Sequence, residues 1–272
     1  MARKLAVLAG SGPLPAQVVA AASATGAEVF VLAFHGETDP GLVQGLEHHW
    51  LPLGAVGRAI DVLHAAQVQD VVLIGAMRRP ALAKLGLDRR GLQLLTRVGL
   101  RRLGDNQLLS LIVEELEAEG FRVIGADVLI GQALAPEGPL TALQPDPAAL
   151  RDIALGVQVV ARLGDLDIGQ AAVVQQGLVL GVEAVEGTDA LLARCAALQR
   201  PGPGAVLVKL KKPGQERRAD LPTIGPDTIQ VAAEANIAGI AVHAGHSLII
   251  ARDQVTAAAD RAGLFVIGIS GP

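Results

Sequence analysis

Strands and helices alternate through the first half of the chain, and this order constrains the fold more than any other feature of the sequence. Short apolar runs predict strands at residues 5–8, 28–33, 49–53, 71–74 and 122–124. Helical periodicity predicts helices at residues 13–25, 56–66 and 106–119, and residues 78–102, rich in Arg and Leu, are interpreted as helical excursions at a sheet edge. Such alternation is typical of a parallel sheet covered by helices. We therefore expect an α/β fold for this half.

A second domain is expected after a stretch that has no sustained periodicity. Residues 131–147 contain prolines at positions 136, 139, 145 and 147, and we interpret them as a linker between domains at 1–130 and 148–272. Two runs, 171–174 and 178–182, joined by Gln-Gln-Gly, predict a β-hairpin. The remaining pattern predicts helices at 148–163, 188–199, 227–235 and 254–262 and strands at 205–210, 237–242, 247–250 and 265–269. This domain is predicted to be mixed α/β, with a strand order that the sequence does not define.

Composition argues against several classes of function. Aromatic residues make up 2% of the chain, Tyr is absent and the formal net charge is −4. The chain therefore offers neither the stacking surface nor the positive charge that nucleic-acid binding requires. The single cysteine, Cys195, cannot form an internal disulfide and fits a small buried side chain. The sequence has neither a signal peptide nor an apolar run of about 18 residues that could span a bilayer, so we expect a cytoplasmic location.

The segment with the clearest chemical character is 220–228, Asp-Leu-Pro-Thr-Ile-Gly-Pro-Asp-Thr. Proline and glycine stiffen it, and it lacks the periodicity of a core element. Five cations precede it: Lys209, Lys211, Lys212, Arg217 and Arg218. Carboxylates such as Asp220 and Asp227 can bind a divalent cation while Lys and Arg hold phosphate. The alternative, which the residues leave open, is a solvated turn in which Asp227 or Thr228 caps the following helix.

Two further loops place acidic residues at the ends of predicted elements. One, before the hairpin, contains Asp165, Asp167 and Gln170, and the other, before the next helix, contains Glu186, Thr188 and Asp189. Helix caps have the same composition, so neither loop is specific by itself. Together with Asp220 and Asp227, however, they give the second domain four acidic loop ends. Mg²⁺ needs only one or two carboxylates when it also binds phosphate and water.

The turn Gly10-Ser11-Gly12 lies between the first strand and the first helix, where backbone N–H groups can bind phosphate. A dinucleotide fingerprint needs a third glycine at the helix start and an acidic residue after the second strand. This chain has Pro15 at the first place and Phe34 and His35 at the second, so a nucleotide site is favoured over hydride transfer. The alternative is a turn that only joins strand to helix. His243 and His246 have no Cys or third His nearby, which does not favour zinc.

Several motifs occur together in one order along the chain. They are Leu-Ala-Gly-Ser-Gly-Pro-Leu-Pro at 8–15, Gly-Asp-Asn at 104–106, Asp-Ile-Gly-Gln at 167–170, Gly-Val-Glu-Ala-Val-Glu-Gly-Thr-Asp at 181–189, Lys-Pro at 212–213 with Gln215, the segment 220–228, and Ala-Gly-Leu-Phe-Val-Ile-Gly at 262–268. In this order they resemble the LpxI family of UDP-2,3-diacylglucosamine pyrophosphatases of lipid A biosynthesis. The resemblance covers nearly the full length, and 220–228 and Glu-Gly-Thr-Asp are its most specific parts. The chain departs from the family at Asn106, where an acidic residue is expected, and at His243, where Glu is common.

The resemblance implies a fold and a reaction. The fold would be α/β, with an N-terminal Rossmann-like parallel-sheet domain, a C-terminal mixed α/β catalytic domain and the substrate between them. The reaction would be hydrolysis of the diphosphate of UDP-2,3-diacylglucosamine to UMP and 2,3-diacylglucosamine 1-phosphate (lipid X), with Mg²⁺ as cofactor. In that reaction Mg²⁺ would polarise a diphosphate oxygen, Lys and Arg would neutralise charge, and a carboxylate would orient or bind the attacking water.

The resemblance also implies roles for individual residues. Asp227 would be catalytic and would bind the metal, and Asp220 would be a second catalytic residue of the same motif. The residues implied in substrate binding are Gly10, Ser11, Gly12, Asp167, Gln170, Glu186, Thr188, Asp189, Lys209, Lys212, Gln215, Arg218, Thr223 and Thr228. Among these, Lys209, Lys212, Gln215 and Arg218 would hold phosphate.

The implied partners are a lipid-linked UDP-sugar and the inner-membrane surface, where the protein would be peripheral on the cytoplasmic side. The Arg-rich residues 78–102 could contact anionic lipid, and the sequence leaves a homo-oligomer open. Two alternative functions remain. A nucleotide-binding oxidoreductase rests on the Gly-Ser-Gly turn, and a non-catalytic nucleotide-sugar or lipid-binding module would bind its ligand without turnover.

Overall fold

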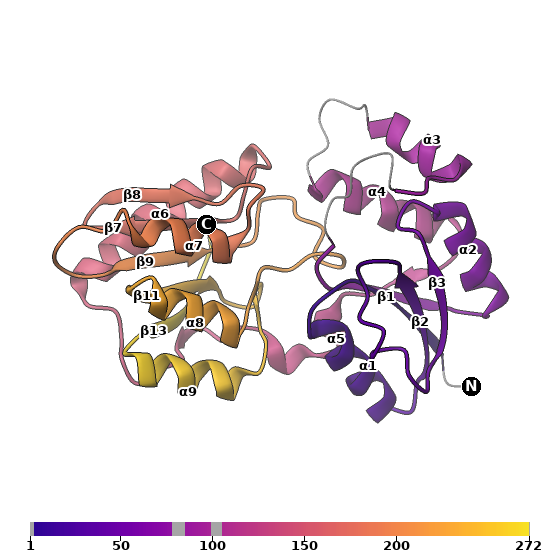
Figure 1. The fold of residues 1–272 in the computed structure, drawn as a ribbon, viewed down its shortest axis with the longest axis horizontal. Coiled ribbons are helices and arrows are strands. Elements are labelled where there is room, and N and C mark those ends of the chain that lie inside the picture. The colour runs from indigo at the N-terminus through magenta and orange to yellow at the C-terminus, as the bar shows by residue number, and fades with distance from the viewer. Residues whose placement is uncertain (1–2, 78–84, 99–104, 272) are drawn as a thin grey trace. The chain divides into compact units, whose positions relative to one another are not determined.

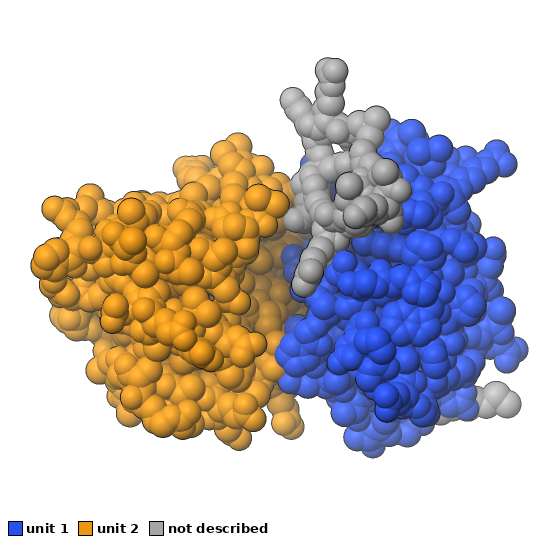
Figure 2. Space-filling view, viewed as in Figure 1, with its two compact units in different colours: residues 1–131, 216–220 blue, residues 132–215, 221–272 orange. Residues whose placement is uncertain are grey.

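The chain folds into two compact units. The computed structural model describes residues 3–77, 85–98 and 105–271, without the side chains of residues 97, 98, 105 and 106. Unit 1 comprises Met1–Gly131 and Glu216–Asp220, and unit 2 comprises Gln132–Gln215 and Leu221–Pro272 (Figure 2). The predicted linker at 131–147 contains a 3-10 helix, Gly131–Ala133, and strand β6, Gly138–Pro139. No helix in the described ranges is long and apolar enough to cross a bilayer.

Unit 1 is built on a five-stranded parallel sheet, as the alternation of elements predicts. Its strand order is β3-β2-β1-β4-β5 (Figure 1). The strands are β1 (Lys4–Ala9), β2 (Glu28–Phe34), β3 (Glu47–Leu51), β4 (Asp70–Ile74) and β5 (Arg122–Val123). All neighbouring pairs are parallel. The carboxyl ends of all five strands therefore lie at one edge of the sheet.

Helices cover both faces of this sheet. The helices of unit 1 are α1 (Leu14–Ala24), α2 (Val56–Ala65), α3 (Arg89–Val98), α4 (Asp105–Ala118) and α5 (Ala126–Leu129). Alternate residues of β1 point to opposite faces. Val7 packs with Val18 of α1, whereas Leu8 packs with Leu63 of α2 and Val113 of α4. Helix α3 packs against α2 and α4, and the rest of the predicted excursion, residues 78–84 and 99–102, lies outside the described residues.

Unit 2 contains a six-stranded mixed sheet with the order β6-β13-β11-β9-β7-β8. The central strands β9 (Ala205–Lys209), β11 (Ile237–His243) and β13 (Phe265–Ile269) are parallel to one another. β7 (Ala171–Gln175) runs antiparallel to β9, and with β8 (Leu178–Val182) it forms the predicted hairpin. A separate parallel pair joins β10 (Thr223–Ile224) to β12 (Leu248–Ile249).

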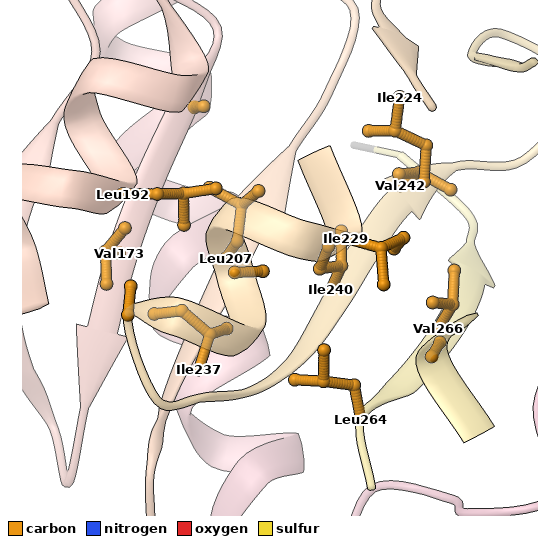
Figure 3. Packing of buried hydrophobic residues seen from close by; sticks show 14 of the residues in the cluster. Val173, Leu192, Leu207, Ile224, Ile229, Ile237, Ile240, Val242, Leu264 and Val266 are labelled. Atoms are coloured by element: carbon orange, nitrogen blue, oxygen red, sulfur yellow. The ribbon is translucent and has the colours of Figure 1, made fainter. Parts of the chain in front are cut away.

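The unit 2 sheet is also covered on both faces. Helix α6 (Pro147–Asp165) packs on one face through Ile153 and Val160. Helices α7 (Thr188–Ala196), α8 (Pro226–Glu234) and α9 (Arg252–Ala262) cover the other. Figure 3 shows this second core, where Leu192 and Ile229 meet the strand residues Leu207 and Ile240. The result is an α/β protein with two domains, in agreement with the predicted fold class.

Candidate functional site

Three loops that contain predicted site residues meet at one edge of the unit 2 sheet. β9 and β8 end at this edge and antiparallel β7 begins there, so residues 166–170, 183–187 and 210–215 come together. Helix α8 precedes the parallel strand β11, so its first turn, with Asp227, also lies toward this edge. Ligands of open α/β sheets bind outside the carboxyl ends of the parallel strands. The topology therefore makes this edge the candidate site of unit 2.

A buried chain of polar side chains crosses this edge. Lys209 Nζ donates a hydrogen bond to Thr188 Oγ1 at 2.6 Å, and the Thr188 hydroxyl donates to Glu183 Oε1, also at 2.6 Å. The second carboxylate oxygen of Glu183 accepts the backbone N–H of Gln170 at 3.0 Å. The direction of each bond is fixed, because an ammonium can only donate and a carboxylate can only accept. The Thr188 hydroxyl is therefore locked between a cation and an anion.

This arrangement keeps a charged lysine inside the protein. Lys209 and Glu183 are 7% and 5% exposed, and a buried charge is tolerated when it is paired and hydrogen-bonded. Within the described residues the Lys209 ammonium makes one hydrogen bond, to Thr188. Since an ammonium carries three donors, two stay available for an anionic ligand.

A second buried lysine lies on the loop that follows β9. Lys212 Nζ is 2.5 Å from Asp167 Oδ1. The amide of Gln215 accepts the backbone N–H of Lys212 at 2.9 Å and donates to Gln170 Oε1 at 3.3 Å. Asp167 Oδ2 is buried without a hydrogen-bond partner among the residues that the structure describes. The second carboxylate oxygen is thus an unused acceptor beside a cation.

Asp227 and Thr228 start helix α8 in different ways. The cap position is Gly225, and Thr228 Oγ1 accepts the Gly225 N–H at 3.4 Å. Thr228 is buried and Asp227 is exposed in the first turn. The alternative that one of these side chains caps the helix is therefore confirmed for Thr228, which caps it from the third helical position, and not for Asp227. The Asp227 carboxylate makes no hydrogen bond or ion pair to any described residue.

The neighbouring acidic residues have more local roles. Glu186 Oε1 forms an ion pair with Arg194 at 2.9 Å. The pKa of Glu186 lies below its ordinary value because of its own backbone N–H and this ion pair. Asp189 is exposed in the first turn of α7, and Thr223 Oγ1 donates to the carbonyl of Leu221 at 3.0 Å.

Arg218 and Asp220 belong to the segment that is part of unit 1. Arg218 donates through Nε and Nη2 to both oxygens of Glu216, each at 2.9 Å, and Nη1 is 2.5 Å from Glu117 Oε1. These carboxylates raise the pKa of Arg218, with Glu216 contributing most. Asp220 donates its backbone N–H to the carbonyl of Glu216 at 2.9 Å. A phosphate would have to compete with two carboxylates for Arg218.

The turn Gly10-Ser11-Gly12 is packed closely against the end of β4. Ser11 exchanges two backbone hydrogen bonds with Ala76, and a Cβ at Gly10 would lie 2.6 Å from the carbonyl oxygen of Ala76. Helix α1 begins after this turn with proline at 13 and 15, which have no N–H. The helix therefore offers fewer phosphate donors than the N-terminus of an ordinary helix.

The carboxylates of the described residues can be compared with the ligands that the predicted Mg²⁺ would need. No group of three or more His, Cys, Asp or Glu side chains that could hold a metal ion occurs in the part of the chain that the structure describes. Mg²⁺ commonly binds through one or two carboxylates, with water and substrate phosphate completing its shell. An exposed carboxylate without protein partners, such as that of Asp227, fits this mode of binding.

Cys195 and His243 of unit 2 also have shifted pKa values. Burial raises the pKa of the Cys195 thiol, and the side chain is fully buried, as expected from the sequence. Burial, followed by the charges of His246 and Lys211, lowers the pKa of His243.

Glu183 is the site residue that the sequence predictions missed. It follows β8 directly and lies five positions before Thr188. A carboxylate immediately after a strand end was the available signal, but the prediction used the acidic residues before the next helix, Glu186 and Asp189.

Comparison with known proteins identifies relatives of both halves. The model of the LpxI N-terminal domain matches residues 4–133, and that of the LpxI C-terminal domain matches residues 136–267. A protein of Caulobacter vibrioides described as "UDP-2,3-diacylglucosamine pyrophosphatase LpxI" is 41% identical over 276 residues, which cover 98% of each chain.

Solved structures give weaker likenesses. A glycinamide-RNase-transformylase T from Mycobacterium tuberculosis covers 68% of this chain and 44% of its own, with 13% identity and a TM-score of 0.26. A 3-oxoacyl-reductase from Bacillus thuringiensis, described as putative, covers 62% of this chain and 74% of its own, with 10% identity and a TM-score of 0.28. Likenesses at this level carry no argument about function.

Proposed function

The chain belongs to the LpxI family, and from this membership we infer that it is a UDP-2,3-diacylglucosamine pyrophosphatase of lipid A biosynthesis. The observation that carries this inference is 41% identity over 98% of both chains. Hydrolysis of the diphosphate in such a substrate gives UMP and 2,3-diacylglucosamine 1-phosphate. A diphosphate is highly anionic, so the protein must supply positive charge where the substrate binds.

The two buried lysines of unit 2 supply that charge. Lys209 keeps two ammonium donors beyond its bond to Thr188, and Glu183 stabilises its charge from the far side of the hydroxyl. Lys212 neutralises Asp167 in the structure and can exchange this partner for a phosphate oxygen. Fixed donors in a buried setting stabilise developing negative charge better than mobile surface lysines do.

Asp227 is the residue that would hold Mg²⁺. Its carboxylate is exposed and has no partner among the described side chains, so binding a cation breaks no existing contact. Mg²⁺ supplies Lewis-acid polarisation of a phosphoryl oxygen when it is bound. Asp220, Thr223 and Thr228 belong to the same motif and complete the loop that carries Asp227.

We further propose that the protein acts at the cytoplasmic surface of the inner membrane, because the substrate carries two acyl chains. Val185 is 98% exposed, and Leu166 and Ile168 are exposed on the neighbouring loop. The two loops are in contact, since a Cβ at Gly169 would lie 2.0 Å from the carbonyl oxygen of Glu183. The exposed apolar side chains of these two loops give the membrane surface a contact beside the lysine network. A Val185→Asp variant that floats with liposomes as well as the wild type would contradict this part of the proposal.

The reaction is tested by UMP release from UDP-2,3-diacylglucosamine in detergent micelles. We expect turnover with Mg²⁺, and a loss of at least about 100-fold when EDTA removes it, because a bound metal stabilises several kcal/mol of transition-state charge. Tight binding of substrate without turnover under any divalent metal would instead indicate a non-catalytic binding module.

A further inference from the structure

Asp167 carries a carboxylate at the end of helix α6, at a position where glycine is usual. Its φ is 52°, in the left-handed region. The Asp167 N–H donates to the carbonyl of Gly164 at 3.0 Å. The next N–H, of Ile168, donates to the carbonyl of Leu163 at 3.1 Å, which completes the helix end. Glycine is preferred at this left-handed position because it has no Cβ, so the helix end does not explain the aspartate side chain.

The Asp167 carboxylate uses only one of its two oxygens. Oδ1 pairs with Lys212 Nζ at 2.5 Å, whereas Oδ2 is buried and accepts no hydrogen bond from any described residue. A buried acceptor without a donor is costly, so the position suits a ligand that brings a donor. The side chain as a whole is 23% exposed, and the χ2 angle of aspartate turns over a broad range. Either oxygen can therefore face a ligand.

The cation beside this carboxylate is held in place by its own backbone. Lys212 is 8% exposed, and its backbone N–H donates to Gln215 Oε1 at 2.9 Å. Gln215 in turn donates to Gln170 Oε1 at 3.3 Å. Gln170 and Asp167 belong to one short loop, so Lys212 is attached to that loop through its ammonium and through its backbone. A group that binds to Lys212 Nζ must therefore lie beside the Asp167 carboxylate.

The substrate of the proposed reaction has a hydrogen-bond donor next to its phosphate. The phosphate is attached at C1 of the glucosamine. C2 carries the nitrogen, so the acyl chain at C2 is linked by an amide that has an N–H group. The acyl chain at C3 is linked by an ester, which has no donor, and the hydroxyls at C4 and C6 lie farther from C1. The amide N–H is thus the donor that a phosphate bound at Lys212 would bring toward Asp167.

We propose that Asp167 accepts a hydrogen bond from the C2 amide N–H of the substrate and thereby selects substrates with an amide-linked chain at C2. The assignment rests on the proposed function, in which Lys212 exchanges Asp167 for a phosphate oxygen. This exchange takes away the side-chain hydrogen bond that the carboxylate accepts, and the amide N–H replaces it. Leu166 and Ile168, on either side of Asp167, are exposed apolar residues that can contact the acyl chain as it leaves the amide.

The first test compares two substrates that differ in a single group. One is UDP-2,3-diacylglucosamine, and the other is UDP-2,3-di-O-acylglucose with the same acyl chains, in which an ester oxygen replaces the amide N–H. We expect the wild type to have a kcat/KM about 10- to 100-fold higher for the amide, the range for hydrogen bonds to charged groups. In Asp167→Gly the ratio of the two kcat/KM values should fall to within about threefold of one. Glycine suits the left-handed position, so this variant keeps the helix end.

Asp165→Ala is the matched control. Asp165 is the last residue of α6, its side chain is 51% exposed, and it pairs with Arg162 at 3.6 Å. It should keep the wild-type ratio. If Asp167 only neutralised Lys212, its loss would lower kcat/KM for both substrates by the same factor. An unchanged ratio in Asp167→Gly, or a wild-type ratio near one, would overturn the proposal.

The second test measures binding without turnover. Titration calorimetry in detergent micelles compares 2,3-diacylglucosamine 1-phosphate with its C2 ester analogue. We expect the wild type to bind the amide more tightly and Asp167→Gly to bind both compounds alike. Wild-type protein that binds the two compounds equally, or binds neither, would overturn the proposal.

The two claims can fail independently. Turnover of the amide and ester substrates with equal kcat/KM would remove this role of Asp167 and leave the hydrolase. Amide-selective binding of the 1-phosphate without any turnover would keep the role of Asp167 and remove the hydrolase.

Discussion

At the scale of single residues, the hydroxyl of Thr188 is the contact on which the unit 2 site depends most. It receives a hydrogen bond from Lys209 and gives one to Glu183, and all three side chains are buried. Removing this hydroxyl would leave a buried cation and a buried anion without their shared partner. Leaving such groups unsatisfied costs more than the hydrogen bonds contribute.

Thr188→Val and Thr188→Ser test this role. Val has the shape of Thr without the hydroxyl, and we expect kcat/KM to fall about 10- to 100-fold, because hydrogen bonds to charged groups contribute about 1.5–3 kcal/mol. Ser keeps the hydroxyl and should stay within about threefold of the wild type. The measurement is kcat/KM corrected for the folded fraction of each variant. Equal losses in both variants would show that packing, and not the hydroxyl, matters.

His243 gives a prediction about pH. Burial lowers its pKa in the folded protein, so the unfolded chain binds the proton more readily. The free energy of unfolding should therefore decrease as the pH falls below about 6.5, the ordinary pKa of histidine. Urea denaturation at pH 7.5 and 5.5 measures the difference, and His243→Asn should reduce it. A variant with the same pH dependence as the wild type would contradict this assignment.

At the scale of elements, the sequence predicts individual strands and helices better than their arrangement. The helix at Val56–Ala65 and the hairpin of β7 and β8 appear as predicted, because amphipathic period and turn residues are local signals. Strand β3 begins at Glu47, two residues before the predicted run. Its first three residues are all exposed, so they show no alternation of apolar and polar side chains from which a strand could be predicted. The order of the unit 2 sheet depends on long-range pairing and could not be predicted from local patterns.

Gly10 shows how an element junction restricts a residue. Its Cα lies so close to the end of β4 that a Cβ would be 2.6 Å from Ala76 O and 2.7 Å from Gly75 C. Both contacts are backbone atoms, which cannot rotate away. Gly10→Ala should therefore lower the free energy of unfolding by about 1–3 kcal/mol, the usual cost of overpacking.

The control for this prediction is Gly131→Ala. A Cβ there has nothing within 4 Å. Chemical denaturation of both variants measures the difference, and a Gly10→Ala protein as stable as Gly131→Ala would show that the junction can relax.

At the scale of the whole molecule, the motif at 220–228 is shared by the two units. Glu216–Asp220 belongs to unit 1, where Arg217 pairs with Asp127 at 2.8 Å and Arg218 pairs with Glu117. Asp227 belongs to unit 2. The sequence shows a continuous loop, and only tertiary contacts reveal this division. Arg217 and Arg218, two of the five cations expected near phosphate, have carboxylate partners in this unit.

Most residues of the candidate site in unit 2 could be predicted from the sequence, but their contacts could not. Six residues that were expected at the site are brought together by hydrogen bonds in the structure: Lys209, Thr188, Gln170, Asp167, Lys212 and Gln215. Glu183 was missed because its importance lies in contacts with residues of two other segments, Thr188 and Gln170. Such contacts between separate segments cannot be predicted from the local sequence.

The measurement that tests the central claim most directly compares Asp227→Ala with Asp253→Ala in UMP release from UDP-2,3-diacylglucosamine with Mg²⁺. Both aspartates are exposed in the first turn of a unit 2 helix, so both substitutions remove the same favourable charge from a helix N-terminus. We predict that Asp227→Ala lowers kcat at least about 100-fold, as removal of the metal does, and still binds substrate. Asp253→Ala should retain its activity. Activity of Asp227→Ala equal to that of Asp253→Ala would contradict the assignment of Asp227 as the catalytic residue.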